Sequence, residues 1–209
     1  MSLAVTERAA LADLFEQVGP DRPTLCEGWQ TRDLLAHLLV RERDPIGAVG
    51  NQVTPLRGFT ERAHAAYGKR PWAEQVELYR SGPPAWNPTG WGPINDLANA
   101  GEMFIHHEDV RRGAPGWRRR EFDARDTAEL VRSVRSGLTR LAVRRARCGI
   151  EVRMPGAEPV VLRKGDPTVT LIGEPGEIVL WLSGRDAVEI EFDGDPAAVG
   201  GVRTLQRGF

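Results

Sequence analysis

Asn99-Ala-Gly-Glu-Met-Phe-Ile-His-His-Glu-Asp109 is a short run in which two kinds of metal-binding side chain recur at helical spacing. On a helix, residues three and four positions apart lie on the same face. Asn99, Glu102, His106 and Asp109 therefore form one stripe. A carboxylate and an imidazole one turn apart can bind one divalent cation. Because such pairs also occur on ordinary solvated helices, a metal site requires at least one further ligand from elsewhere in the chain.

A candidate for that ligand is His37, in Trp29-Gln-Thr-Arg-Asp-Leu-Leu-Ala-His-Leu-Leu-Val40. Thr31 is the expected helix N-cap, and Asp33 suits the positive end of the helix dipole. The leucines around His37 predict that its imidazole is at least partly buried. A buried histidine can also be a core residue that hydrogen-bonds a carbonyl. Two histidines and one carboxylate, however, are a common ligand set for a catalytic divalent metal.

The motif Trp-x-x-Arg-Asp-Leu-x-x-His of residues 29–37 resembles the second-helix signature of DinB-like metal-binding four-helix bundles. The segment Glu102-Met-Phe-Ile-His-His-Glu-Asp109 resembles the Glu-x-x-x-His-x-x-Asp segment of the actinobacterial branch typified by mycothiol-dependent maleylpyruvate isomerase. Val179-Leu-Trp-Leu-Ser-Gly-Arg185 resembles part of the small C-terminal domain of the same proteins, which is sterol-carrier-like. The resemblance thus extends over nearly the whole chain.

This resemblance implies that His37, Glu102 and His106 bind a divalent metal, zinc first and nickel, iron or cobalt as alternatives. It also implies a low-molecular-weight thiol of the mycothiol type and a small electrophilic substrate, joined in a transfer or isomerisation reaction. Arg185 corresponds to the family's C-terminal arginine, although it could simply bind carbonyl groups. Asp109 is expected to support a ligand imidazole or to act as a base.

The composition agrees with a cytoplasmic enzyme. The 209 residues include 28 basic and 29 acidic side chains, so no overall charge indicates nucleic acid or an anionic membrane as a partner. The two cysteines do not form a disulfide framework and are expected to be free thiols. The N-terminus lacks the pattern of a signal peptide, and no apolar run is long enough to span a bilayer.

Apolar spacing predicts a helical N-terminal domain over residues 1–148 and a small mixed α/β domain over residues 149–209, so the fold class is α+β. Helices are expected over residues 3–18, 31–49, 59–67, 93–112, 123–147, 175–184 and 196–206, and a further helix is expected to begin at Pro71. Strands are expected over residues 150–154, 160–164, 168–172 and 187–192. Asp195 is the expected N-cap of the last helix. The loop 82–93 contains two tryptophans, Trp86 and Trp91, that could cover a pocket or hold the loop in place.

Several alternatives remain open from the sequence alone. His107 points about 100° away from His106 on an ideal helix and would replace it as a ligand if the register differed. His64 is expected at the surface. The protein could also be a metal-dependent hydrolase, a non-catalytic metal or small-ligand binder, or a bundle in which His37, Glu102 and His106 form a metal-free polar network. Both a monomer and a homodimer are compatible with the sequence.

Overall fold

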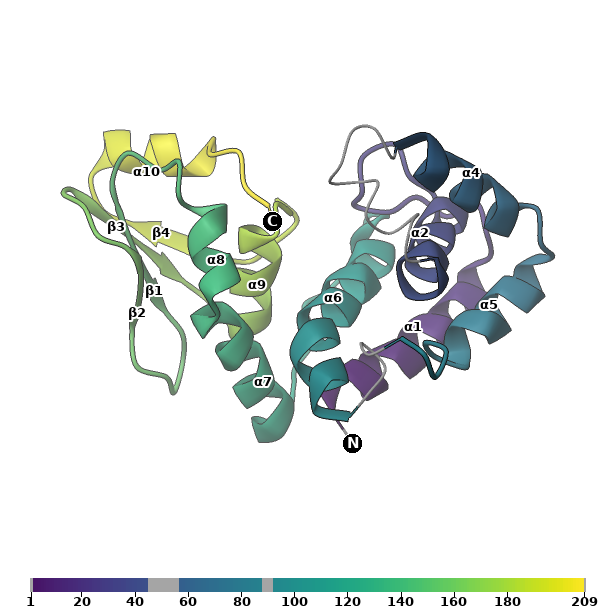
Figure 1. Ribbon diagram of the computed structural model, residues 1–209. Helices are drawn as coiled ribbons and strands as arrows, with labels where there is room; N and C mark the ends of the chain where they lie inside the picture. The colour runs from purple at the N-terminus through teal and green to yellow at the C-terminus, as the bar shows by residue number, and fades with distance from the viewer. Residues whose placement is uncertain (1, 45–56, 88–91, 209) are drawn as a thin grey trace. The chain divides into compact units, whose positions relative to one another are not determined.

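The computed structural model describes residues 2–44, 57–87 and 92–208, and its elements make an α+β structure (Figure 1). The chain forms two compact units, Met1–Arg118 and Arg119–Phe209. The first unit is helical, and the second contains a four-stranded sheet with helices.

The described part of the N-terminal unit contains the helices α1 (Leu3–Val18), α2 (Thr31–Arg43), α4 (Arg57–Gly68), α5 (Trp72–Arg80) and α6 (Gly92–Arg112). α1 packs against α5 and α6, and α2 packs against α4 and α5. The predicted helix over residues 3–18 is confirmed. It ends at Gly19, whose φ of 75° is one that glycine adopts without strain.

The core of this unit consists of apolar side chains that recur every three or four residues along the helices, as an amphipathic pattern requires. Its fully buried members include Leu11, Phe15, Leu34, Leu35, Leu38, Leu39, Tyr79 and Met103. The Phe15 ring meets Trp72 and Tyr79 edge-on, at centroid distances of 5.8 and 6.0 Å. α1 and α5 are thus joined by aromatic packing.

The helix that carries His37 differs from the expectation at both ends. Gln30, not Thr31, is its N-cap, and the Gln30 amide donates to Asp33 Oδ2 at 2.9 Å. The Thr31 hydroxyl is engaged with the preceding loop instead, where it donates to the Gly19 carbonyl at 2.6 Å. The helix ends at Arg43, since Asp44 is extended (φ −129°, ψ 94°). Residues 45–49 of the predicted helix lie outside the described residues, as does Trp91 of the predicted loop.

The single helix predicted over residues 123–147 is wrong, because the chain forms two helices, α7 (Ala124–Arg135) and α8 (Gly137–Ala142). Ser136 between them is extended, with ψ 157°. The Thr139 hydroxyl donates to the carbonyls of Val134 and Ser136, at 2.8 and 2.7 Å, and so stabilises the break. The apolar spacing continues through residues 136 and 137 and therefore gave no sign of this change in direction.

The strands are β1 (Gly149–Arg153), β2 (Val160–Arg163), β3 (Thr168–Ile172) and β4 (Glu191–Asp193), in the order β2-β1-β3-β4. β1 is parallel to β3 and antiparallel to β2, and β3 is antiparallel to β4. The first three predicted strands are confirmed within a residue or so, while the fourth is shorter than predicted. Alternate residues such as Ile150, Val152, Val169 and Leu171 are fully buried.

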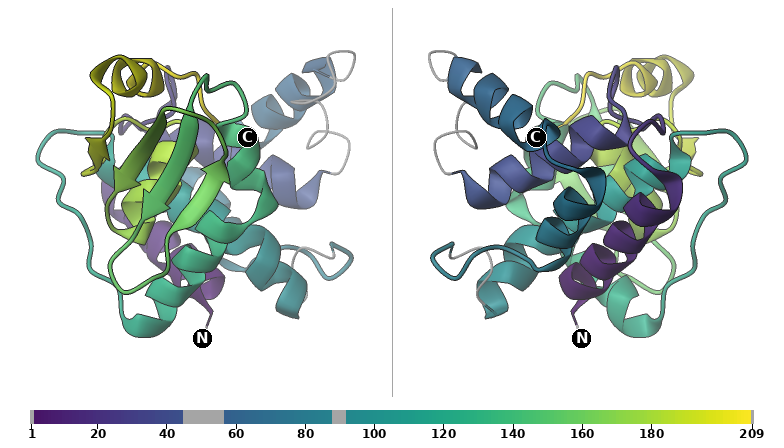
Figure 2. Two further views of the ribbon diagram at one scale, coloured as in Figure 1. Left: turned by 90° about the vertical axis from the view of Figure 1, so that its left-hand side faces the viewer. Right: turned by 90° about the vertical axis from the view of Figure 1, so that its right-hand side faces the viewer.

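The helices α9 (Pro175–Leu182) and α10 (Pro196–Arg203) complete the C-terminal unit. α7 packs against α9, α8 contacts β2, and α10 contacts β3. These contacts explain why the compact unit begins at Arg119, whereas the sequence pattern changes at residue 149 where the strands begin. Figure 2 shows α9 behind the sheet, and every residue of α9 is buried.

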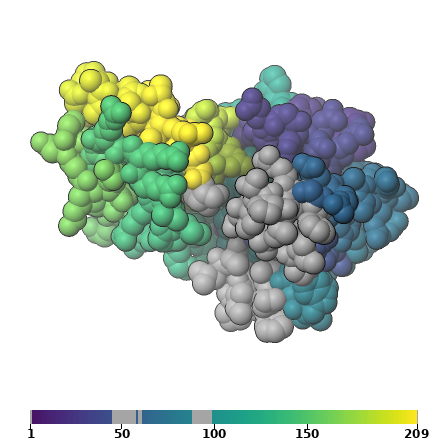
Figure 3. Space-filling view, turned by 45° about the horizontal axis from the view of Figure 1, so that its top comes forward, coloured from purple at the N-terminus to yellow at the C-terminus, as the bar shows by residue number. Residues whose placement is uncertain are grey.

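α10 lies at the surface of the C-terminal unit, where Figure 3 shows it in yellow, and Val202 is its buried residue. As predicted, Asp195 is its N-cap, and Asp195 Oδ1 accepts the Ala198 amide at 2.9 Å. Among the described helices, none combines the length and the apolar character that a bilayer crossing requires.

Candidate metal centre

The helical stripe on α6 brings Glu102, His106 and Asp109 together as the spacing predicted. The imidazole of His106 lies between the two carboxylates: its Nε2 is 3.6 Å from Glu102 Oε2, and its Nδ1 is 2.9 Å from Asp109 Oδ2. Asp109 is fully buried and His106 is 9% exposed, whereas the Glu102 side chain is 35% exposed. One nitrogen of His106 thus faces a buried carboxylate and the other faces a carboxylate that solvent can reach.

His37, on α2, reaches the same imidazole from a second helix. The rings of His37 and His106 contact each other edge-on, at a centroid distance of 5.8 Å. The ring of Trp29 also contacts the ring of His37, at a centroid distance of 5.3 Å. The Nδ1 atom of His37 is buried and has no hydrogen-bond partner among the described residues. A buried polar atom without a partner is costly, so this nitrogen is suited to a ligand that the protein alone does not supply.

The environment keeps His37 neutral. Burial lowers the pKa of His37 to about 3, and the charges of His106 and His64 act in the same direction. At pH 7 a lone pair on the His37 imidazole is therefore available to a cation without the loss of a proton.

The environments of Glu102 and His106 favour their charged forms. Burial by itself raises the pKa of Glu102, but the hydrogen bond with His106 and the charge of Arg41 outweigh it and bring this pKa to about 2. Burial lowers the pKa of His106, but hydrogen bonds to Asp109, Cys26 and Glu102 raise it well above 6.5. In the absence of a cation, the proton on His106 balances part of the negative charge around it.

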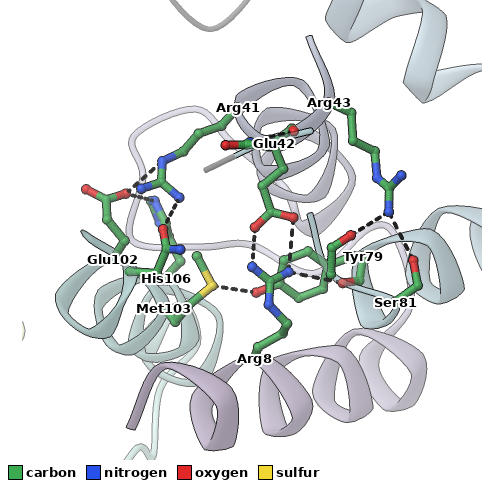
Figure 4. Close-up of polar contacts among 12 residues, drawn as sticks. Arg8, Arg41, Glu42, Arg43, Tyr79, Ser81, Glu102, Met103 and His106 are labelled. Carbon is green, nitrogen blue, oxygen red and sulfur yellow. Dashed lines mark hydrogen bonds and ion pairs between the residues drawn. The ribbon is translucent and has the colours of Figure 1, made fainter. Parts of the chain in front are cut away.

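Arg41 lies one turn after His37 on α2 and extends towards α6 (Figure 4). Its Nη1 donates to Asn99 Oδ1 at 3.0 Å, and its Nε lies 3.7 Å from Glu102 Oε2. The guanidinium therefore connects two members of the α6 stripe to α2. Arg41 did not stand out in the sequence, although its spacing of four residues from His37 places it on the same helix face.

Beside this site, a second ion pair, between Arg8 and Glu42, connects α1 to α2. Arg8 makes a two-pronged contact with the carboxylate of Glu42, which is 1% exposed, and it also donates to the Tyr79 carbonyl at 3.1 Å (Figure 4). The Tyr79 hydroxyl in turn donates to Met103 Sδ at 3.0 Å. The four helices α1, α2, α5 and α6 are thus connected through buried polar groups beside the candidate centre.

Cys26 is a group at the site that the sequence did not indicate. Its Sγ donates to Asp109 Oδ2 at 3.3 Å, on the Nδ1 side of His106. Cys26, His106 and Asp109 each offer a potential ligand atom, and these three atoms all lie within 4.8 Å of one another. Within residues 2–44, 57–87 and 92–208, this is the one group of three potential ligands that lie so close together. His37 contacts the His106 ring without joining such a group.

The loop that carries Cys26 is held against the end of α6 by its backbone. The Leu25 amide donates to the Asp109 carbonyl, and the Trp29 amide donates to the Cys26 carbonyl, at 3.0 and 2.9 Å. Gly113, just after α6, lies so close that an added Cβ would be 2.1 Å from the Pro23 carbonyl oxygen. A glycine at this position is therefore required for the loop to approach the helix.

The two remaining histidines, His107 and His64, have different surroundings. His107 Nδ1 lies 2.7 Å from Glu7 Oε2, so this imidazole is engaged with α1. His64 is half-buried, whereas the sequence suggested a surface residue: its ring contacts those of His37 and Trp29, at 5.8 and 6.2 Å, and its Nε2 is buried without a partner among the described residues. The short helix around it gave no apolar pattern from which this could be inferred.

Arg185 lies in the C-terminal unit, directly after α9. Its Nη1 donates to the Ser183 carbonyl at 2.6 Å, the carbonyl-binding role that the sequence left open for it.

The comparison with protein families gives a match to the mycothiol maleylpyruvate isomerase N-terminal domain over residues 3–87. This N-terminal segment belongs to that domain family, within the DinB-like helical superfamily. The matched segment includes α1, α2, α4 and α5, and with them Cys26 and His37. Glu102, His106 and Asp109 lie on α6, which follows the matched segment. No curated protein and no solved structure matched the chain significantly.

Proposed function

We propose that His37, Glu102 and Nε2 of His106 bind a divalent cation, with zinc as the first candidate. The observation that supports this best is the contact of Glu102 with His106 across one helical turn, beside the neutral imidazole of His37. The Nδ1 atom of His37, which has no hydrogen-bond partner among the described residues, fits a residue that binds a ligand from outside the protein. Two imidazoles and one carboxylate leave positions free for a substrate or water.

The surrounding residues would orient these ligands. Asp109 accepts a hydrogen bond from Nδ1 of His106, which fixes the ring and directs Nε2 towards Glu102. Arg41 holds the Glu102 carboxylate on the side of α2. His106 must release its Nε2 proton before it can act as a ligand, so cation binding should weaken as the pH falls.

We infer a thiol-dependent activity from the domain family, which links this segment to mycothiol and a metal. A bound divalent cation lowers the pKa of a coordinated thiol and so provides thiolate near neutral pH. The proposed reaction is the transfer or isomerisation of a small electrophile by a low-molecular-weight thiol of the mycothiol type in the cytoplasm. In this proposal the N-terminal unit is a DinB-like four-helix bundle, the C-terminal unit is sterol-carrier-like, and Arg185 binds an anionic part of the substrate.

A metal-free polar network is the main rival. Arg41, Glu102, His106 and Asp109 already form a connected set of hydrogen bonds and ion pairs, so the stripe on α6 is largely satisfied without a cation. Such a network would fix the position of α6 and have no catalytic role. A non-catalytic metal binder and a metal-dependent hydrolase are further alternatives.

Elemental analysis of the tag-free protein separates these possibilities. We expect the metal content to fall by about one equivalent in His37→Ala and in Glu102→Gln, and to stay unchanged in His107→Gln, a matched imidazole that pairs with Glu7. Equal metal contents in the wild type and the first two variants would exclude the proposed ligands. If the site binds metal, consumption of small electrophiles with and without an added thiol then distinguishes a thiol-dependent enzyme from a hydrolase or a simple binder.

A further inference from the structure

The Nδ1 side of His106 carries a second set of metal-binding atoms that the proposed function does not use as ligands. Cys26 Sγ lies 3.3 Å from Asp109 Oδ2, the same oxygen lies 2.9 Å from His106 Nδ1, and the three donor atoms are within 4.8 Å of one another. We propose that Cys26, Asp109 and Nδ1 of His106 form a separate binding site for a thiophilic divalent cation such as zinc or cadmium.

The spacing of the donor atoms suits this role. With typical zinc–ligand bonds of about 2.0–2.3 Å and tetrahedral angles, the donors would be about 3.3–3.6 Å apart. The two measured separations, 2.9 and 3.3 Å, are shorter than this by a few tenths of an ångström. Small movements of the side chains would therefore bring the donors to the spacing that a tetrahedral ion needs.

The charges of the three donors also suit a buried divalent ion. When the cation binds, the thiol of Cys26 and Nδ1 of His106 each release a proton, and a proton on Nε2 of His106 remains. The thiolate and the Asp109 carboxylate then supply two negative charges against two positive ones. A neutral set avoids leaving an uncompensated charge in the interior, where Asp109 is fully buried.

The site is preformed, and it is open on one side. The amide of Leu25 binds the carbonyl of Asp109, so the loop and α6 keep the thiol beside the carboxylate. Cys26 is only partly buried and gives an entering ion a path from solvent. The Cys26 site makes no use of Glu102 or His37, but it shares the His106 ring with the Nε2 site, so a neutral His106 imidazole can bind a cation on only one side at a time.

The test is a titration of the metal-free protein with cobalt(II), since a thiolate bound to cobalt(II) gives an intense charge-transfer band in the near ultraviolet that nitrogen and oxygen ligands do not give. We expect the band in the wild type, its loss in Cys26→Ser, and its retention in Cys148→Ser, which removes the other cysteine of the chain. Asp109→Asn should weaken the band at limiting cobalt(II).

The same titration distinguishes cation binding at the Cys26 site from cation binding at the Nε2 site. Glu102→Gln and His37→Ala remove ligands of the proposed Nε2 site and should leave the charge-transfer band intact, even if that other site proves not to bind metal. The inference is overturned if the wild type shows no such band, or if the band survives in Cys26→Ser while circular dichroism shows both proteins folded. In that outcome Cys26 and Asp109 only hold the imidazole by hydrogen bonds.

Discussion

Arg41 places a positive charge beside the proposed cation, so its replacement should strengthen metal binding. Two effects oppose each other in Arg41→Gln. The variant loses the ion pair with Glu102, and it also loses the repulsion between the guanidinium and a divalent ion. Their relative size decides the direction of the change.

The ion pair is the weaker of the two effects. Arg41 Nε is 3.7 Å from Glu102 Oε2, and both side chains are partly exposed, at 25 and 35%. Pairs of this kind contribute about 0.2–1 kcal/mol. Glutamine also retains an amide that can donate to Asn99, the other partner of Arg41.

The repulsion is larger. An ion bound to Glu102 Oε2 at about 2.1 Å can lie no more than about 6 Å from Arg41 Nε. A unit charge and a double charge at that separation repel by about 1.4 kcal/mol in bulk water, and by several times more at the effective dielectric constant of a protein surface. Even the bulk-water repulsion exceeds the ion pair by about 0.4–1.2 kcal/mol, so Arg41→Gln should bind zinc at least about two- to eightfold more tightly than the wild type.

Competition with a chromogenic chelator at low and high salt measures this affinity. Arg41→Lys serves as the matched control because it keeps the charge, and its affinity should remain near that of the wild type. Because mobile ions screen the repulsion, the gain in Arg41→Gln should shrink at high salt. Weaker binding by Arg41→Gln would refute the reasoning and would mean that Arg41 acts chiefly by orienting Glu102.

Three further predictions concern stability, measured by urea denaturation of the metal-free protein. The pKa of His37 is about 3 in the folded protein and near 6.5 in the unfolded chain, so the unfolded chain takes up a proton as the pH falls below 6.5. Between pH 7.5 and 5, the free energy of unfolding of the wild type should therefore fall by about 2 kcal/mol more than that of His37→Gln. Arg8→Met should cost about 3–5 kcal/mol because it leaves the Glu42 carboxylate buried without its partner, and Arg8→Met combined with Glu42→Leu should recover most of the loss; a small effect of the single change would contradict this account. Gly113→Ala should cost about 1–3 kcal/mol because its Cβ meets the backbone at Pro23, whereas Gly137→Ala, whose Cβ would meet no atom of the described residues within 4 Å, serves as the control and should be nearly neutral.

Periodicity and capping residues were sufficient to predict most of the fold. α1 and the first three strands lie within a residue or so of their predicted positions because each has a clear apolar pattern and a strong boundary signal, such as Gly19. The break at Ser136 could not be predicted in this way, since it depends on hydrogen bonds of Thr139 to two carbonyls and leaves the apolar spacing unchanged.

The candidate site was predictable where it depends on one helix and not where it depends on loops. The spacing of Glu102, His106 and Asp109 on α6 follows directly from helical geometry. Cys26 reaches Asp109 only because a loop, far away in the sequence, lies against the end of α6 at Gly113. A single sequence contains no local pattern for such an approach.

The adjacent imidazoles of His106 and His107 point in different directions, one towards the candidate centre and the other towards Glu7 on α1. Together they make α6 sensitive to the insertion or deletion of a single residue. One extra residue before position 102 would turn the helix by about 100° and break both sets of contacts at once. Variants of this protein should therefore tolerate changes of length in the loops around α6 far better than changes within it, and a transplanted centre would need the whole helix with its α1 partner.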